Sequence, residues 1–367
     1  MFPVMSSAHK LNGYLFCLMM AGMLLYSLPT VFSFGKSQTD ALSLFMDGKL
    51  LRKFEQRYDK DIFLRDPSVR LWADIQYRVF GEGSAGVVLG KDGWLYTNQE
   101  YLIPNDLDTN LNHQLDRIAK VQQLLQAHGK RLVMLPVPMK LDIYAEHARS
   151  PADPRALDLY QRFVSELGQR QIDTAALQQA FKRQRGETDL FVRTDTHWSP
   201  AGARLAAQEL VRQYPQLRSE HPYVSRQVGE KALKGDLLNY VQFAPALAPQ
   251  LFDNVTIALY ETTNDAQDVS EDSLFGEQQQ PIALVGSSYS KIDDWNFVGF
   301  LKEAMQNDLV SVAVEARGPF QAMDEFTASD LLSNPHIQTV IWEFPVRTVL
   351  AQRDGTKSWQ TAQHHPF

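Results

Sequence analysis

A wholly apolar run that ends in glycine and serine constrains the fold of this chain more than any other feature. Residues 281–285 read Pro-Ile-Ala-Leu-Val, and Gly286, Ser287 and Ser288 follow at once. A short run without polar positions is typical of a strand that is buried on both faces of a parallel sheet. Ligands of an open α/β sheet bind beyond the carboxyl ends of its strands. Ser288 therefore stands where a nucleophile is expected.

The rest of the chain alternates predicted helices with apolar strands. Helices are predicted over residues 69–80, 113–128, 155–168, 174–183 and 201–214, a hairpin over 87–96, and further strands over 131–137, 309–315 and 338–344. Strands separated by helices indicate an α/β fold with a doubly wound parallel sheet. Residues 215–280 are less regular, and we expect them to form an excursion over the site or, alternatively, a surface insertion without a role.

A second motif supplies a carboxylate and an imidazole. Asp195 and His197 lie two residues apart in a segment that is expected to be extended, so their side chains can point to the same side. Ser199 is the predicted N-cap and Pro200 the first residue of the helix that follows. Together with Ser288, about 90 residues later, these groups are the three parts of a nucleophilic acyl-transfer site.

Simpler readings of both motifs stay open. Gly-Ser-Ser after a strand can be only a turn, and Asp-x-His can be only a cap or a hydrogen-bonded surface pair. Asp-x-His is also a metal-ligand spacing, but the other histidines form no second cluster that the sequence places beside it, so we expect neither a metal nor a cofactor. A helix that starts here would let the backbone N–H of Ser288 or Tyr289 hold an oxyanion. Ser290 stands where the G-x-S-x-G elbow of α/β-hydrolases needs glycine, which excludes that superfamily.

Five segments together resemble a known family. In chain order they are residues 90–96 (GKDGWLY), 136–140 (PVPMK), 195–199 (DTHWS), 286–290 (GSSYS) and 341–347 (IWEFPVR). They resemble the signatures of the AlgJ/AlgX family of alginate O-acetyltransferases, whose catalytic domain is SGNH-hydrolase-like, and the match spans about residues 60–350.

The resemblance implies a role for each residue of the site. Ser288 would be the nucleophile, His197 its general base, and Asp195 the group that orients and balances the imidazole. The order Asp, His, Ser is permuted relative to the usual SGNH-hydrolase order. Two positions depart from the family pattern: Ser287 precedes the nucleophile, where relatives often carry Thr or Asp, and Met139 replaces a small residue.

The charge balance bears on the substrate. With a net charge of −7 the chain has no basic footprint for nucleic acid. An anionic polyuronate would need a local group of cations against this overall field. The candidate substrate-binding residues are Lys140, Arg193, Tyr289 and Arg347, although solvated or structural roles are the usual ones for such cations.

The amino terminus predicts a membrane anchor. Residues 11–34 contain no charged side chain and are long enough to cross a bilayer as a helix. Lys10 and Lys36 flank the run on both sides, so charge does not define its orientation. Because the run is longer than the usual core of a signal peptide, we favour an uncleaved signal-anchor over residues 1–34, with cleavage after Ser33 as the alternative.

The remaining boundaries complete the expected layout. Residues 35–60 are expected to be a linker, 61–350 the acetyltransferase domain and 351–367 a short polar tail. A carbohydrate-binding module of the kind that AlgX-type members carry after the catalytic domain is not expected, which makes the layout AlgJ-like.

The resemblance also implies an activity and partners. An acetyl group would pass from a donor to Ser288 and then to a sugar hydroxyl of an exported polysaccharide, with alginate as the best match. The enzyme would lie at the Gram-negative inner membrane on its periplasmic side. Its donor would be an MBOAT-type membrane acyltransferase, because one apolar span cannot carry acetyl groups across a membrane, and other polysaccharide acetylation and export components would accompany it. The rival expectations are a polysaccharide acetylesterase and a non-catalytic tethered scaffold.

Overall fold

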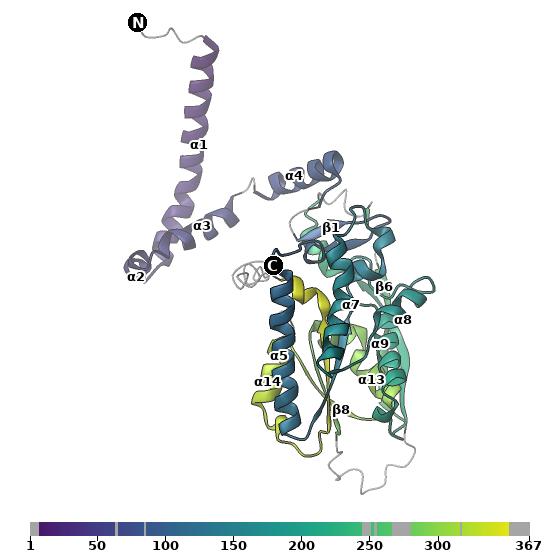
Figure 1. Ribbon diagram of the computed structural model, residues 1–367. Coiled ribbons are helices and arrows are strands. Elements are labelled where there is room, and N and C mark those ends of the chain that lie inside the picture. Colours follow the sequence, from purple (N-terminus) through teal and green to yellow (C-terminus); the bar gives the residue numbers. More distant parts are fainter. Residues whose placement is uncertain are drawn as a thin grey trace. The chain divides into compact units, whose positions relative to one another are not determined.

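The chain forms two compact units, Met1–Asp74 and Ile75–Phe367. The computed structural model describes residues 7–62, 65–83, 86–243, 251–252, 255–265, 280–315 and 318–351. Figure 1 shows the helices and strands of both units in sequence colours. Most of the predicted polar tail, residues 352–367, lies outside the described part, as does much of the acidic stretch after residue 265.

Helices make up the N-terminal unit. Its elements are α1 (Ser7–Ser37), α2 (Ala41–Met46) and α3 (Leu50–Asp61), and α4 (Arg65–Phe80) contains the boundary between the units. Within α1, Leu11–Ser37 is long and apolar enough to cross a membrane, with a mean hydropathy of 1.9. The predicted apolar segment is thus one continuous helix. The predicted linker, residues 35–60, is largely helical because it contains α2 and most of α3.

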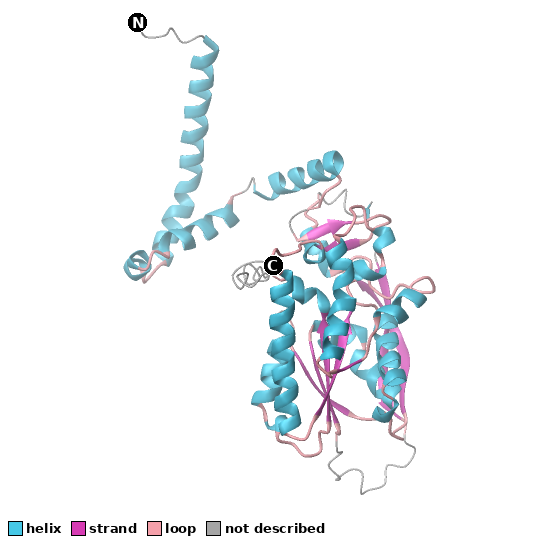
Figure 2. Cartoon of the chain, viewed as in Figure 1, coloured by secondary structure: helices cyan, strands magenta, loops and turns pink. Residues whose placement is uncertain are grey.

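A five-stranded parallel sheet forms the centre of the second unit, as the sequence predicts (Figure 2). Its order is β4-β3-β9-β7-β8, and the strands are β3 (Arg131–Val137), β4 (Asp173–Thr174), β7 (Ile282–Gly286), β8 (Leu309–Ala313) and β9 (Thr339–Pro345). The apolar run that precedes Ser287 is therefore β7, which pairs with β8 on one side and β9 on the other.

Helices cover both faces of this sheet, which explains why β7 is apolar at every position. Leu284 packs into a core with α8 (Gln178–Gln184), α9 (Pro200–Gln213) and α13 (Phe297–Met305). Ala283 and Val285 point the other way, into a core with α5 (Leu107–Ala127), α7 (Pro154–Gln169) and α14 (Pro319–Ala328). Successive side chains of a strand alternate between faces, so both sets are buried.

The shorter elements complete the description. They are β1 (Val87–Leu89), β2 (Leu95–Thr97), α6 (Lys140–Ile143), α12 (Ser288–Lys291) and the 3₁₀ turns η1 (Asn98–Glu100), η2 (Ala145–His147), η3 (Pro215–Leu217), η4 (Asp236–Tyr240), η5 (Asp293–Trp295), η6 (Asp330–Leu332) and η7 (Val346–Leu350). The predicted hairpin over 87–96 is present as β1 and β2, and its turn places Asp92 and Gly93 at φ values of 54° and 76°.

One predicted helix is wrong at its start. The sequence predicts a helix over residues 174–183, but Thr174 belongs to β4 and α8 begins at Gln178. The backbone N–H of Ala175 donates to the carbonyl of Met134 on β3, so the edge of the sheet takes these residues before the helix can begin.

The irregular stretch 215–280 contains an antiparallel pair. Its strands are β5 (Tyr223–Leu233) and β6 (Val255–Asn264), with a bulge between Gln227 and Gly229. The pair packs on α9 and α13, where the rings of Tyr260 and Phe300 lie 5.2 Å apart. The connection after β5 carries Asp236 into the neighbourhood of His197, so the excursion does reach the site.

Candidate functional site

The structure brings the three predicted residues together in one hydrogen-bonded line. His197 Nδ1 lies 2.7 Å from Asp195 Oδ1, and His197 Nε2 lies 2.7 Å from Ser288 Oγ. Asp195 and His197 are buried, while Ser288 is partly exposed. Such a line of carboxylate, imidazole and hydroxyl lets the imidazole accept the hydroxyl proton while the carboxylate stabilises the resulting cation.

The loop that carries Asp195 and His197 is held by the start of α9. Ser199 is the N-cap as predicted, because its hydroxyl accepts the N–H of Gly202 at 3.2 Å, and Pro200 is the first helical residue. Any Cβ on Gly202 would meet the carbonyl oxygen of Leu190 at 2.1 Å, so only glycine fits this close approach.

The predicted nucleophile lies on a turn that follows β7 directly. Ser288 is the first residue of the single-turn helix α12, and Ser287 is its N-cap. The indole N–H of Trp198 donates to the carbonyl of Tyr289 at 3.2 Å, which ties this turn to the loop of His197. The two halves of the site are thus joined through residues next to the reacting groups.

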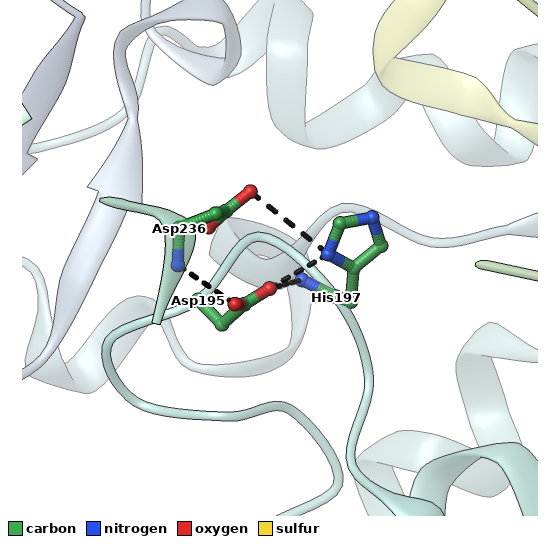
Figure 3. A group of neighbouring side chains, drawn as sticks. All are labelled: Asp195, His197 and Asp236. Atoms are coloured by element: carbon green, nitrogen blue, oxygen red, sulfur yellow. Dashed lines mark hydrogen bonds and ion pairs between the residues drawn. The ribbon is translucent and has the colours of Figure 1, made fainter. Parts of the chain in front are cut away.

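A fourth residue, Asp236, braces the carboxylate–imidazole pair (Figure 3). Its backbone N–H donates to Asp195 Oδ2 at 2.8 Å, and its own Oδ1 accepts the N–H of Thr196 at 2.7 Å. Its Oδ2 lies 3.9 Å from His197 Nδ1. Asp236 is not among the site residues predicted from the sequence. The glycine before it, Gly235, is a local signal in the sequence, and the structure explains it: a Cβ there would meet the carbonyl oxygen of Thr194 at 2.1 Å.

The pKa values of the two carboxyl groups in this cluster are shifted in opposite directions. Burial alone would raise the pKa of Asp195, but hydrogen bonds from the ring and backbone of His197 and from Asp236 hold it below its ordinary value. Burial and the negative charge of Asp195 raise the pKa of Asp236 above its ordinary value. Asp195 is therefore the anion that accompanies His197 at neutral pH.

Asp195, His197 and Asp236 are also the group of described residues that a metal ion could use. One ligand atom from each lies within 4.8 Å of the others. These ligand atoms already have hydrogen-bond partners, because both oxygens of Asp195 accept backbone N–H groups and both ring nitrogens of His197 lie within hydrogen-bond distance of side-chain oxygens. A cation here would have to displace one of these partners.

A buried glutamate lies beneath the nucleophile turn. Glu343, on β9, has no exposed surface, and its carboxylate accepts the N–H of Ser287 at 2.7 Å. The same carboxylate accepts the hydroxyls of Ser287 and Ser290 at 2.9 and 3.0 Å. Burial raises its pKa, and these hydrogen bonds oppose the rise. A Cβ on Gly286 would lie 2.9 Å from this carboxylate, so glycine is required there. Glu343 belongs to one of the family-like segments, but it is not among the site residues predicted from the sequence.

Lys140, a candidate substrate contact, lies inside the protein. It is 1% exposed. Its ammonium donates to the backbone carbonyls of Leu95, Val192, Arg193 and Asp195 at 2.7 to 2.9 Å. An ammonium has three protons, so this set leaves none for a ligand. Lys140 therefore fixes the segment that carries Asp195 through these hydrogen bonds.

Tyr289 and Arg347 also support the site from within. Tyr289 is buried, and its hydroxyl donates to the carbonyl of Thr196 at 2.9 Å and accepts a hydrogen bond from Arg347. The ring of Tyr289 meets that of His197 edge-on at 4.8 Å. Arg193 differs from these candidates, since its side chain is 48% exposed and pairs with Asp189 at 2.7 Å.

The fold and the site define a protein of the SGNH hydrolase-like class. The family model described as "SGNH hydrolase-like domain, acetyltransferase AlgX" matches residues 87–346, and the chain belongs to this family.

Its relatives include named alginate proteins. The chain is 34% identical over 334 residues to the probable alginate O-acetylase AlgJ of Pseudomonas syringae pv. tomato, covering 88% of this chain and 84% of that protein. For the Pseudomonas aeruginosa protein of the same name, the identity is 35% over 345 residues, covering 90% and 86%. Among solved structures, the O-acetyltransferase domain of Pseudomonas putida AlgJ matches with a TM-score of 0.66 and 30% identity, covering 73% of this chain and 94% of that one.

Proposed function

We propose that this protein is an O-acetyltransferase that acetylates hydroxyls of an exported polysaccharide, alginate, through an acetyl-serine on Ser288. The observation that carries the proposal is the pair of 2.7 Å hydrogen bonds that links Asp195, His197 and Ser288 in line. The names of the relatives, alginate O-acetylases, support the choice of acyl group and acceptor.

The first half-reaction loads the enzyme. His197 Nε2 takes the proton of the Ser288 hydroxyl while the oxygen attacks the acetyl carbonyl of the donor. Asp195 stabilises the imidazolium that forms, and the backbone N–H of Ser288, at the start of α12, is the proposed oxyanion donor. The imidazolium then protonates the leaving group, and the bond between acetyl carbon and serine oxygen remains.

The second half-reaction transfers the acetyl group. His197 accepts the proton of a sugar hydroxyl, whose oxygen attacks the acetyl-serine. The Ser288 oxygen leaves and takes back the proton from His197. Water in place of the sugar would give an acetylesterase, so exclusion of water by bound polysaccharide is what makes the protein a transferase.

The long apolar helix α1 supports a proposal for the place of the reaction. The proposed anchor holds the protein in the inner membrane with the catalytic unit on the periplasmic side, where an exported polysaccharide passes. Acetyl-CoA stays in the cytoplasm, and a single span cannot form a route for acetyl groups. The proposed donor is therefore an MBOAT-type membrane acyltransferase, which works beside other polysaccharide acetylation components.

The test separates transfer, hydrolysis and scaffolding in one series. The full chain in detergent is given a chromogenic acetyl ester, alone and with defined oligouronates or neutral glucans, and products are analysed by mass spectrometry. We expect acetylated oligouronate and an acetyl adduct on the peptide that contains Ser288.

Ser288→Ala should abolish both products, whereas Ser290→Ala, which removes a hydroxyl from the same turn, should keep the adduct. Acetate without acetylated sugar would identify an esterase, and no acetyl release from the folded wild-type chain would identify a scaffold.

A further inference from the structure

The short helix α2 carries a bare apolar face. Leu42, Phe45 and Met46 are 77%, 68% and 78% exposed. Their spacing of three and four residues puts them on one side of the helix. Exposed apolar groups of this size, gathered on one face, mark a surface that contacts something other than water.

The length of α1 places this face near a membrane surface. The uncharged run of residues 11–34 spans roughly 36 Å at 1.5 Å per residue, against about 30 Å for the hydrocarbon core of a bilayer. If α1 spans the bilayer, its last turns, with Ser33 and Ser37, lie at the level of the lipid headgroups. Because α2 begins at Ala41, its apolar face is within reach of the same level.

A polar hollow lies at this level. α3 folds back against the end of α1, where the rings of Phe34 and Phe54 meet edge-on at 5.4 Å. The hollow beside them has a volume of about 270 Å³. It is lined by Ser33, Phe34, Ser37, Gln38, Lys53 and Arg57.

Three cations of α3 lie along one side of the helix. Lys53, Arg57 and Lys60 recur at intervals of four and three residues and so lie along one side of the helix. Glu55 and Asp59 lie on the opposite side, where Asp59 forms an ion pair with Arg65 at 2.8 Å. The described lining of the hollow contains the cations Lys53 and Arg57 and no acidic residue.

We propose that α2 and α3 form a foot in the headgroup layer of the membrane. The apolar face of α2 enters the boundary of the acyl chains, and Lys53 and Arg57 bind the phosphate of an anionic phospholipid in the hollow. Apolar burial combined with attraction between cations and anionic lipid is how interfacial helices bind membranes. This inference rests on the proposed membrane span of α1. It attaches α2 and α3, which follow α1 in the chain, to the bilayer surface.

The first test measures depth. Cys17 is the single cysteine of the chain and lies in α1, so a nitroxide on it reports the span itself. In a Cys17→Ser background, nitroxides are placed at Phe45→Cys and, as the control on another face of α2, at Ser43→Cys. The full chain is reconstituted in nanodiscs of phosphatidylcholine and phosphatidylglycerol, and collisions with oxygen and with a water-soluble nickel complex are compared.

We expect the label at position 17 to be deep, the label at 45 to favour oxygen, and the label at 43 to favour nickel. If the label at position 45 is as accessible to nickel as the label at 43, while position 17 lies in the bilayer, the foot is overturned and the anchor is not affected. If the label at position 17 is accessible to nickel, both the span and the foot are overturned. The proposed chemistry of Ser288 would not be affected by that result.

The second test addresses the lipid. Native mass spectrometry of the full chain released from the same nanodiscs measures retained phosphatidylglycerol. Lys53→Glu should reduce retention about fivefold or more, since one cation near an anionic surface is worth about 1 kcal/mol. Arg52→Glu makes the same charge change about 100° around the helix and should have little effect. Equal losses in both variants, or displacement of the lipid by millimolar inorganic phosphate, would overturn the headgroup site.

Discussion

Replacing Glu343 tests how the nucleophile turn is held. Glu343→Ala would leave the N–H of Ser287 without the acceptor that now lies at 2.7 Å, and would free two hydroxyls in a fully buried place. An unsatisfied buried donor costs about 1–3 kcal/mol, and the cavity adds to this. We therefore expect about 3–5 kcal/mol of destabilisation. Glu343→Gln keeps an acceptor oxygen and the same shape, so we expect it to lose about 1 kcal/mol.

The assay pairs thermal unfolding with acetyl-ester turnover by the full chain. Glu343→Ala should lower Tm by about 10 °C and should lose most turnover even well below its own Tm, because the Ser288 oxygen is no longer fixed opposite His197. Glu343→Gln should stay close to wild type, as should Glu325→Ala, which removes an exposed glutamate from α14. Wild-type Tm and turnover in Glu343→Ala would refute the reasoning.

Three further predictions follow from the same geometry. Asp236→Ala removes the acceptor of the Thr196 N–H and should lower kcat about tenfold, while Asp236→Asn, which keeps an acceptor, should lower it less; equal kcat in all three proteins would contradict the brace. Burial raises the pKa of Asp142 to about 8, above its unfolded value, so its contribution to stability is complete below about pH 4 and is lost as pH rises through about 8. This loss amounts to at most about 5 kcal/mol in the free energy of unfolding, and Asp142→Asn should abolish it. Parallel plots of Tm against pH for both proteins would show that the pKa of Asp142 is not raised. Turnover should survive EDTA, and its loss with recovery on adding zinc would make Asp195, His197 and Asp236 metal ligands instead.

The parts of the fold that the sequence predicted well are those with strong local patterns. β7 is apolar at every position because cores lie on both sides of it, and that pattern is visible without a structure. The cap at Ser199 and the start of α9 at Pro200 also depend on neighbouring residues alone. The pairing of His197 with Ser288, 91 positions apart, came from the chemistry of the two motifs and from the family resemblance.

The parts that failed depend on contacts between distant segments. Asp236 is 41 positions from Asp195, and Glu343 is 56 positions from Ser287. No spacing rule links such positions, because their proximity results from the strand order and the excursion that folds back. The helix predicted from residue 174 failed for the same reason, since the edge of β3 outcompetes local helix propensity.

The candidate cations show why charge is a poor guide to a ligand in this site. A triad drawn from two separate segments needs each segment fixed to a fraction of an ångström, and buried hydrogen bonds to charged groups do this better than apolar contacts, which have no preferred direction. Lys140 holds the Asp195 segment, and Glu343 holds the Ser288 turn. Arg347 supports the Tyr289 hydroxyl that joins the two. A lysine or arginine near the predicted nucleophile suggests an anionic substrate from sequence alone, but Lys140 donates to four backbone carbonyls and Arg347 donates to a phenol, so both have partners inside the protein.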